Sequence, residues 1–123
     1  MTRDAVLQTL HRRRSLAASV PASNESRLAW VGVYPLDPGR PGTAELLRRY
    51  GIATLHADEQ IYRIRKFEVD RSLIAADASL YEQQLSDKED ALAIGDEDLE
   101  AKLQRFGVSL ERLDLPFKSD YPI

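Results

Sequence analysis

The residues best suited to acid–base chemistry are two histidines, His11 and His56, because imidazole titrates near neutral pH. His56 is followed closely by Asp58 and Glu59, so a proton-exchanging set could form there. The same residue types are typical of any hydrophilic hairpin turn. There is no cysteine, too little histidine for a histidine-rich metal site, and no Walker loop, Gly-x-Ser-x-Gly or His-Glu-x-x-His motif. We therefore expect no enzymatic activity, catalytic residue, metal or cofactor.

The densest charge cluster is acidic and lies between residues 86 and 100, where Lys88 is the lone cation. A calcium loop that started at Asp87 would place Ala91 and Leu92 where an oxygen ligand and a glycine are needed, so this interpretation fails. We predict a docking surface for a basic protein partner. Its candidate residues are Asp77, Glu82, Asp87, Glu89, Asp90, Asp96, Glu97, Asp98 and Glu100. A solvated surface is the alternative, since acidic residues are favoured in the first turn of any helix.

Basic residues gather in the first half of the chain and form an alternative nucleic-acid-binding set. Arg63 and Arg65 are two apart on a predicted strand and therefore share a face, with aromatic residues beside them that could stack bases. The isoelectric point near 5.4 argues against this function, and edge-strand charges that discourage aggregation explain the pattern equally well. The set comprises Arg12, Arg13, Arg14, Arg63, Arg65 and Lys66.

Residues 99–113 resemble a repressor-type helix-turn-helix, in which Ala101 on the first helix precedes a Gly107–Ser109 turn. The resemblance implies a second helix that reads bases in the DNA major groove. That helix would offer mainly Glu111 and Arg112 and would stop at Pro116, inside the acidic half of the chain. A helical corner without a DNA-binding role is therefore favoured.

The scaffold that must position these residues is predicted to be α+β. Strand 28–34 is rich in β-branched and aromatic residues, and a hairpin with arms 52–56 and 60–70 follows, with a bulge near Arg65 and Lys66. We expect a small three-stranded sheet, one strand plus this hairpin, packed against an N-terminal helix and a C-terminal group of short helices. A right-handed crossover would make strand 28–34 parallel to strand 52–56. The predicted helices are 2–19, 44–50, one from residue 72, 86–95 and 96–107.

Length and composition restrict the class of protein. A chain of 123 residues suits one domain, 1–123, and no apolar run approaches the roughly 18 residues that span a membrane. Arg12–Arg14 precede an Ala-rich segment as in an export signal, but the apolar stretch 16–20 is too short for one. The absence of cysteine favours a reducing compartment, so we expect a cytoplasmic protein.

Charge is distributed unevenly along the chain, whose net charge is −3. Residues 1–66 carry an excess of Lys and Arg, and residues 67–123 an excess of Asp and Glu. This layout predicts a small acidic protein-binding module that covers a basic site on a partner, as a toxin-neutralising immunity protein or antitoxin does. A regulatory protein that binds nucleic acid through the basic half or the 99–113 corner is the alternative. Mutual neutralisation of the two halves on folding would explain the layout without any partner.

Overall fold

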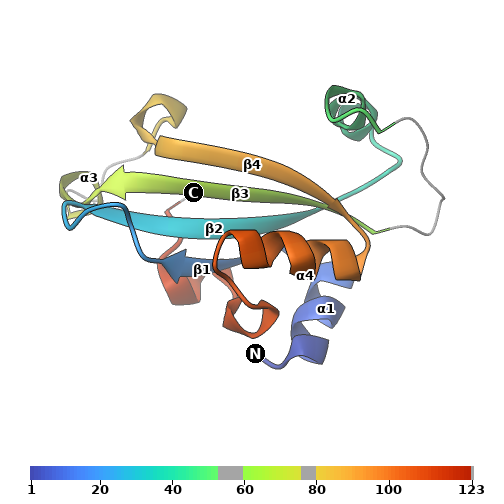
Figure 1. The fold of residues 1–123 in the computed structure, drawn as a ribbon, viewed down its shortest axis with the longest axis horizontal. Helices are drawn as coiled ribbons and strands as arrows, with labels where there is room; N and C mark the ends of the chain where they lie inside the picture. Colours follow the sequence, from blue (N-terminus) through green and yellow to red (C-terminus); the bar gives the residue numbers. More distant parts are fainter. Residues whose placement is uncertain (53–59, 76–79, 123) are drawn as a thin grey trace.

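A four-stranded antiparallel sheet in the order β1-β2-β3-β4 forms the centre of the molecule (Figure 1). The computed structural model describes residues 1–52, 60–75 and 80–122. The strands are β1 (Leu16–Val20), β2 (Arg27–Leu36), β3 (Ile61–Asp70) and β4 (Ser86–Ile94). The α-helices are α1 (Arg3–His11), α2 (Pro41–Arg49), α3 (Arg71–Ala75) and α4 (Asp96–Arg105), and the 3₁₀ turns are η1 (Glu82–Gln84), η2 (Leu110–Arg112) and η3 (Pro116–Ser119). The predicted α+β class is confirmed.

The predicted three-stranded sheet is wrong, because two segments predicted as helix are edge strands. Predicted helix 2–19 ends at His11; Arg13 takes a left-handed conformation (φ 62°), and Leu16–Val20 pairs with β2 as β1. Predicted helix 86–95 is β4, which pairs with β3. In both segments tertiary pairing with a neighbouring strand outweighs the local preference for helix.

The crossover predicted a parallel partner for strand 28–34. The observed strand β2 pairs antiparallel with both of its neighbours. Most of predicted arm 52–56 lies outside the described residues. The helix predicted from residue 72 is observed only as the short α3, and the described residues 80–85 contain just the 3₁₀ turn η1. Three other predictions lie close to the observed elements. Helix 96–107 is observed as α4, strand 28–34 lies within β2, and predicted helix 44–50 overlaps α2. The predicted bulge near Arg65 and Lys66 is a register shift between Lys66 and Glu68.

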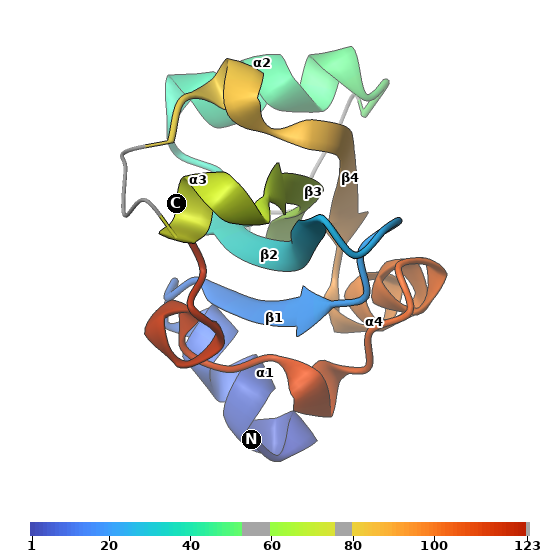
Figure 2. The ribbon, with the colours of Figure 1, turned by 90° about the vertical axis from the view of Figure 1, so that its left-hand side faces the viewer.

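The two faces of the sheet carry separate hydrophobic clusters. The larger one joins the sheet to α1 and α4 and includes Val6, Leu10, Leu99 and Leu103, all without exposed surface. On the other face, here called the second face, Trp30 and neighbouring apolar side chains pack against α3 and the C-terminal segment. Figure 2 shows α4 and α3 on opposite sides of the sheet. Burial of each large apolar side chain contributes about 1.5–3 kcal/mol, so the two layers fix the sheet between them.

A buried carboxylate, Glu68, holds the β1–β2 connection against β3. Only 4% of the residue is exposed, and its oxygens accept hydrogen bonds from Ser23 N (3.1 Å) and Ser23 Oγ (2.6 Å). Arg27 Nη1 lies 3.8 Å from Glu68 Oε1. Burial alone would raise the pKa of the Glu68 carboxyl, but the Ser23 hydrogen bonds and the positive charge of Arg27 outweigh burial and lower it.

Because the folded-state pKa of Glu68 lies below its unfolded value, the carboxylate stabilises the fold at neutral pH. This stability is present above the unfolded pKa, about 4.3, and is lost as pH falls through the folded pKa. We expect Glu68→Gln to lower the free energy of unfolding by about 1–3 kcal/mol near neutral pH and to reduce its fall in acid. Urea unfolding at about pH 7 and about pH 4 measures both effects, with Glu25→Gln as the control. An unchanged acid dependence would contradict this role.

Candidate functional site

The predicted acidic surface is divided between β4 with its preceding turn and helix α4. Asp77 lies outside the described residues. Glu82 belongs to η1, and Asp87, Glu89 and Asp90 belong to the N-terminal half of β4. The remaining four, on α4, are Asp96, Glu97, Asp98 and Glu100. The structure therefore assembles two acidic groups rather than the single helical surface that the sequence predicted.

Most of these carboxylates form ion pairs within the chain. Many of these pairs join the basic first half to the acidic second half, so folding itself neutralises much of the charge asymmetry. Among the described residues, only Glu89 and Glu97 of the predicted set form no ion pair. The ion pairs are Glu82–Arg65, Glu82–Lys88 (3.7 Å), Asp87–Arg27 (3.2 Å), Asp90–Arg63 (3.4 Å), Asp98–Lys102 (3.1 Å), Glu100–Arg3 (2.8 Å) and, when the imidazole is protonated, Asp96–His11 (3.0 Å).

The outer edge of β4 is closed in its C-terminal half by side chains of α4. Ile94 N donates to Asp98 Oδ2 (2.9 Å), and Lys102 Nζ donates to Leu92 O. Burial would raise the pKa of the Asp98 carboxyl, but the Ile94 amide and Lys102 outweigh burial and lower it. Asp98 is therefore an ionised acceptor at neutral pH, and α4 prevents another strand from pairing with this part of the edge.

The N-terminal half of β4 has an edge that no described residue covers. Residues 87–90 are all exposed. Backbone groups alternate along a strand, so the N–H and C=O of Asp90 point the same way as those of Leu92 and Ile94, away from β3. No described residue forms a hydrogen bond with the outward groups of Asp90. Unpaired groups of this kind can accept another strand.

The opposite edge of the sheet, formed by β1, is covered. Ala17 N donates to Asp114 O (2.9 Å), and Asp114 N donates to Ala17 O (3.0 Å). Arg112 Nη2 donates to Ser19 O (3.0 Å). The described residues thus close the edge of β1 and half of the edge of β4, and none of them covers the edge of the acidic half of β4.

The predicted nucleic-acid-binding set is not assembled into one surface. Arg63 and Arg65 lie on the second face, as their spacing predicted, while Lys66 is on the opposite face of β3. Arg12–Arg14 follow α1, where Arg13 pairs with Asp37 (2.8 Å). The 99–113 corner contains α4 and the single 3₁₀ turn η2, so it has no second α-helix to enter a major groove.

The strongest candidate for acid–base chemistry among the described residues is a contact between α1, β3 and α4. The buried Tyr62 hydroxyl donates to Asp96 Oδ1 (2.7 Å), and His11 Nε2 lies 3.0 Å from Asp96 Oδ2. Burial and the Asp96 carboxylate raise the pKa of Tyr62, so its phenol remains protonated. Neither the cavity beside Trp30 nor the one beside Arg13 and Asp37 is lined by these three residues. Its evident role is to hold two helices and a strand together.

His56, Asp58 and Glu59 lie outside the described residues. Within residues 1–52, 60–75 and 80–122, no group of three or more His, Asp or Glu side chains is arranged to hold a metal ion. In the same ranges no helix is long and apolar enough to cross a membrane.

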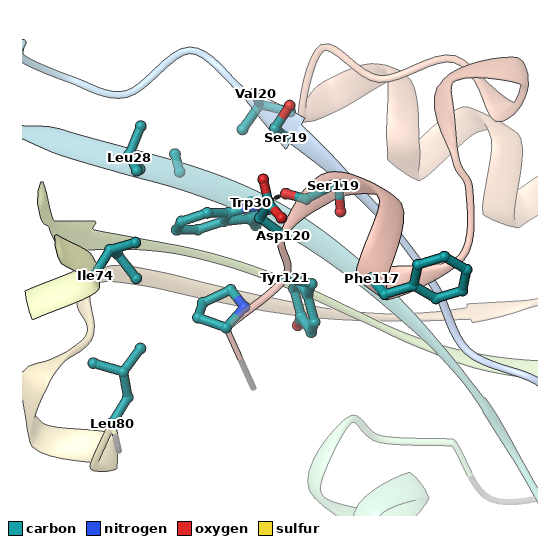
Figure 3. Close-up of a pocket in the computed structure, with 12 residues that line it drawn as sticks. Ser19, Val20, Leu28, Trp30, Ile74, Leu80, Phe117, Ser119, Asp120 and Tyr121 are labelled. Atoms are coloured by element: carbon teal, nitrogen blue, oxygen red, sulfur yellow. Dashed lines mark hydrogen bonds between the residues drawn. The ribbon is translucent and has the colours of Figure 1, made fainter. Parts of the chain in front are cut away.

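A cavity of about 730 Å³ opens on the second face beside Trp30 (Figure 3). The indole N–H of Trp30 donates to Ser119 O (2.7 Å), and this bond fixes the C-terminal segment as one wall. Leu28, Ile74 and Leu80 supply apolar surface. The volume is in the range of small-molecule sites. Sequence patterns could not reveal the cavity, because its walls come from segments far apart along the chain.

Comparison with known proteins adds no assignment, since no protein family, curated protein or solved structure matches the chain.

Proposed function

We propose that this chain binds another protein by accepting a basic strand of that partner at the open edge of β4. The observation that carries the proposal is the N-terminal half of β4, which is exposed on both faces and has unpaired outward backbone groups. Strand addition obtains affinity from such main-chain groups and specificity from the alternating side chains. Asp87, Glu89 and Asp90 favour a partner strand that carries Lys or Arg.

Opposite charges would also accelerate association, and salt would weaken this effect. A protein that neutralises a basic enzyme, such as an immunity protein or antitoxin, is one class that works in this way. The ion pairs of Asp87 and Asp90 with Arg27 and Arg63 are exposed, and exposed pairs contribute only about 0–1 kcal/mol, so a partner's cations can compete for these carboxylates. Charges on an edge strand also suppress self-association, and the experiment below separates this role from partner binding.

The test compares proteins captured from the native cell by the wild type and by two charge-reversal variants. Glu89→Lys with Asp90→Lys should weaken binding of a basic partner by about tenfold or more, or about 1.4 kcal/mol. Glu45→Lys with Glu111→Lys changes the net charge equally, away from β4, and should leave the binding intact. Association with the purified partner should slow markedly in about 0.5 M salt.

Equal capture by all three proteins would overturn the proposal. Captured nucleic acid that disappears after nuclease treatment would favour the alternative, nucleic-acid-binding function. Aggregation of the β4 variant without loss of a partner would assign the edge charges to solubility alone.

A further inference from the structure

Two arginines and two tyrosines meet at the centre of the second face, and we call them the Arg–Tyr cluster: Tyr34, Arg63, Arg65 and Tyr121. Tyr34 and Arg63 are direct partners across β2 and β3, and Gly32 faces Arg65. The ring of Tyr121 reaches the sheet over Gly32, where an added Cβ would lie 2.3 Å from the Tyr121 hydroxyl. The hydroxyls of Tyr34 and Tyr121 form a hydrogen bond. Because Gly32 has no side chain, the Tyr121 hydroxyl has room to join the other three members of the cluster.

The cluster contains donors whose hydrogen-bonding capacity is unmet. The Nε atoms of Arg63 and Arg65 are buried and have no acceptor among the described residues. A buried donor without a partner destabilises the protein, and a donor on a charged group does so more. Burial and the hydrogen bond with Tyr34 raise the pKa of Tyr121, although the charges of Arg65 and Arg63 oppose this. The Tyr121 phenol therefore remains protonated.

The Nη atoms of both guanidinium groups already pair with carboxylates. Arg63 Nη2 lies 3.4 Å from Asp90 Oδ1, and Arg65 Nη2 pairs with Glu82 Oε1. The Glu82 side chain is 60% exposed, whereas that of Arg65 is only 13% exposed. Because Glu82 is exposed, water can solvate its carboxylate after displacement, and the anionic ligand would replace its charge beside the buried Arg65. Arg65 would remain in place, because it is enclosed by the sheet face.

We propose that the Arg–Tyr cluster binds the phosphate group of an anionic ligand, which displaces Glu82 and bridges Arg63 and Arg65. Guanidinium forks bind phosphate through paired N–H groups, so the ligand would engage Nε as well as Nη. A tetrahedral dianion offers more acceptor oxygens than one carboxylate, which suits two forks and two hydroxyls. This site uses side chains of the second face rather than the β4 backbone, and it meets the strand-addition site only at the Arg63–Asp90 ion pair.

Titration calorimetry with phenyl phosphate, inorganic phosphate and a short oligouridine tests the proposal. We expect the wild type to bind a phosphate probe, and Arg63→Gln or Arg65→Gln to weaken this binding by about tenfold or more. Glu82→Gln should strengthen binding because it removes the competing carboxylate. Arg48→Gln and Glu45→Gln are the matched controls for the two changes of charge, and both should bind as the wild type does.

The relative affinities of the three probes show which kind of molecule carries the phosphate group. Tighter binding of the monoester indicates a small phosphorylated ligand, and tighter binding of the oligouridine indicates a nucleic-acid backbone. Failure of every probe to bind the wild type would overturn the proposal. So would unchanged affinity in Glu82→Gln, a variant at an exposed side chain whose folding circular dichroism can verify.

Discussion

Asp90→Pro should destabilise the protein only slightly, whereas Glu89→Pro should destabilise it strongly. Both residues are exposed in the same half of β4, but Glu89 faces Lys66 as a hydrogen-bonded pair and the amide of Asp90 points outward. Proline removes a backbone donor, and sheets tolerate it only where that donor faces solvent. Glu89→Pro should therefore cost about 1–3 kcal/mol or more, through the lost ladder hydrogen bond and its unpaired acceptor, and Asp90→Pro far less.

Urea unfolding of the two variants measures this difference. Glu89→Ala and Asp90→Ala remove the side chains while retaining the amides, so they report any contribution of Glu89 or of the Asp90–Arg63 ion pair. Similar losses of stability in the two proline variants would show that β4 does not have the register described. A folded Asp90→Pro protein would also test the proposed strand addition, because it lacks an outward backbone donor that strand addition requires.

The strands that the sequence revealed are the central ones. β2 contains the run Leu28–Tyr34, whose β-branched and aromatic residues can pack on both faces of a sheet, and β3 alternates well enough to place Arg63 and Arg65 on one face. Both edge strands were predicted as helix. β1 is short and carries helix-favouring alanines, and the Ser86 and Glu89 spacing in β4 imitates a helix capping box. Their strand conformation depends on neighbours that local patterns do not contain.

The binding surfaces were predictable only in part, for the same reason. Sequence shows the excess of acidic residues in the second half of the chain, but it does not show that Arg3, Arg27 and Arg63 fold back to pair with them. It places Arg63 and Arg65 together but gives no sign that Tyr121 reaches the same point. Contacts between residues so distant in sequence arise from the topology of the sheet and its C-terminal segment.

The contact of Tyr121 with Gly32 predicts the effect of adding a single methyl group at the centre of the sheet. In Gly32→Ala the new Cβ would lie 2.3 Å from Tyr121 Oη and 2.8 Å from Tyr121 Cζ, so the ring must move. Displacement would break its hydrogen bond with Tyr34 and its contact with Phe67, whose ring centroid lies 5.5 Å from that of Tyr121. We expect a loss of about 1–3 kcal/mol in the free energy of unfolding.

A double-mutant cycle assigns this loss to Tyr121. In a Tyr121→Ala background the Tyr121 ring is absent and the new Cβ meets only Tyr34 Cε2, at 3.1 Å, so Gly32→Ala should cost far less than it does in the wild type. Gly42→Ala is the matched control, because a Cβ there meets nothing within 4 Å. Equal costs of Gly32→Ala with and without Tyr121 would contradict the proposed contact. A marked fall in the cost of Gly32→Ala would establish that the C-terminal segment is fixed on the sheet by the space that Gly32 leaves.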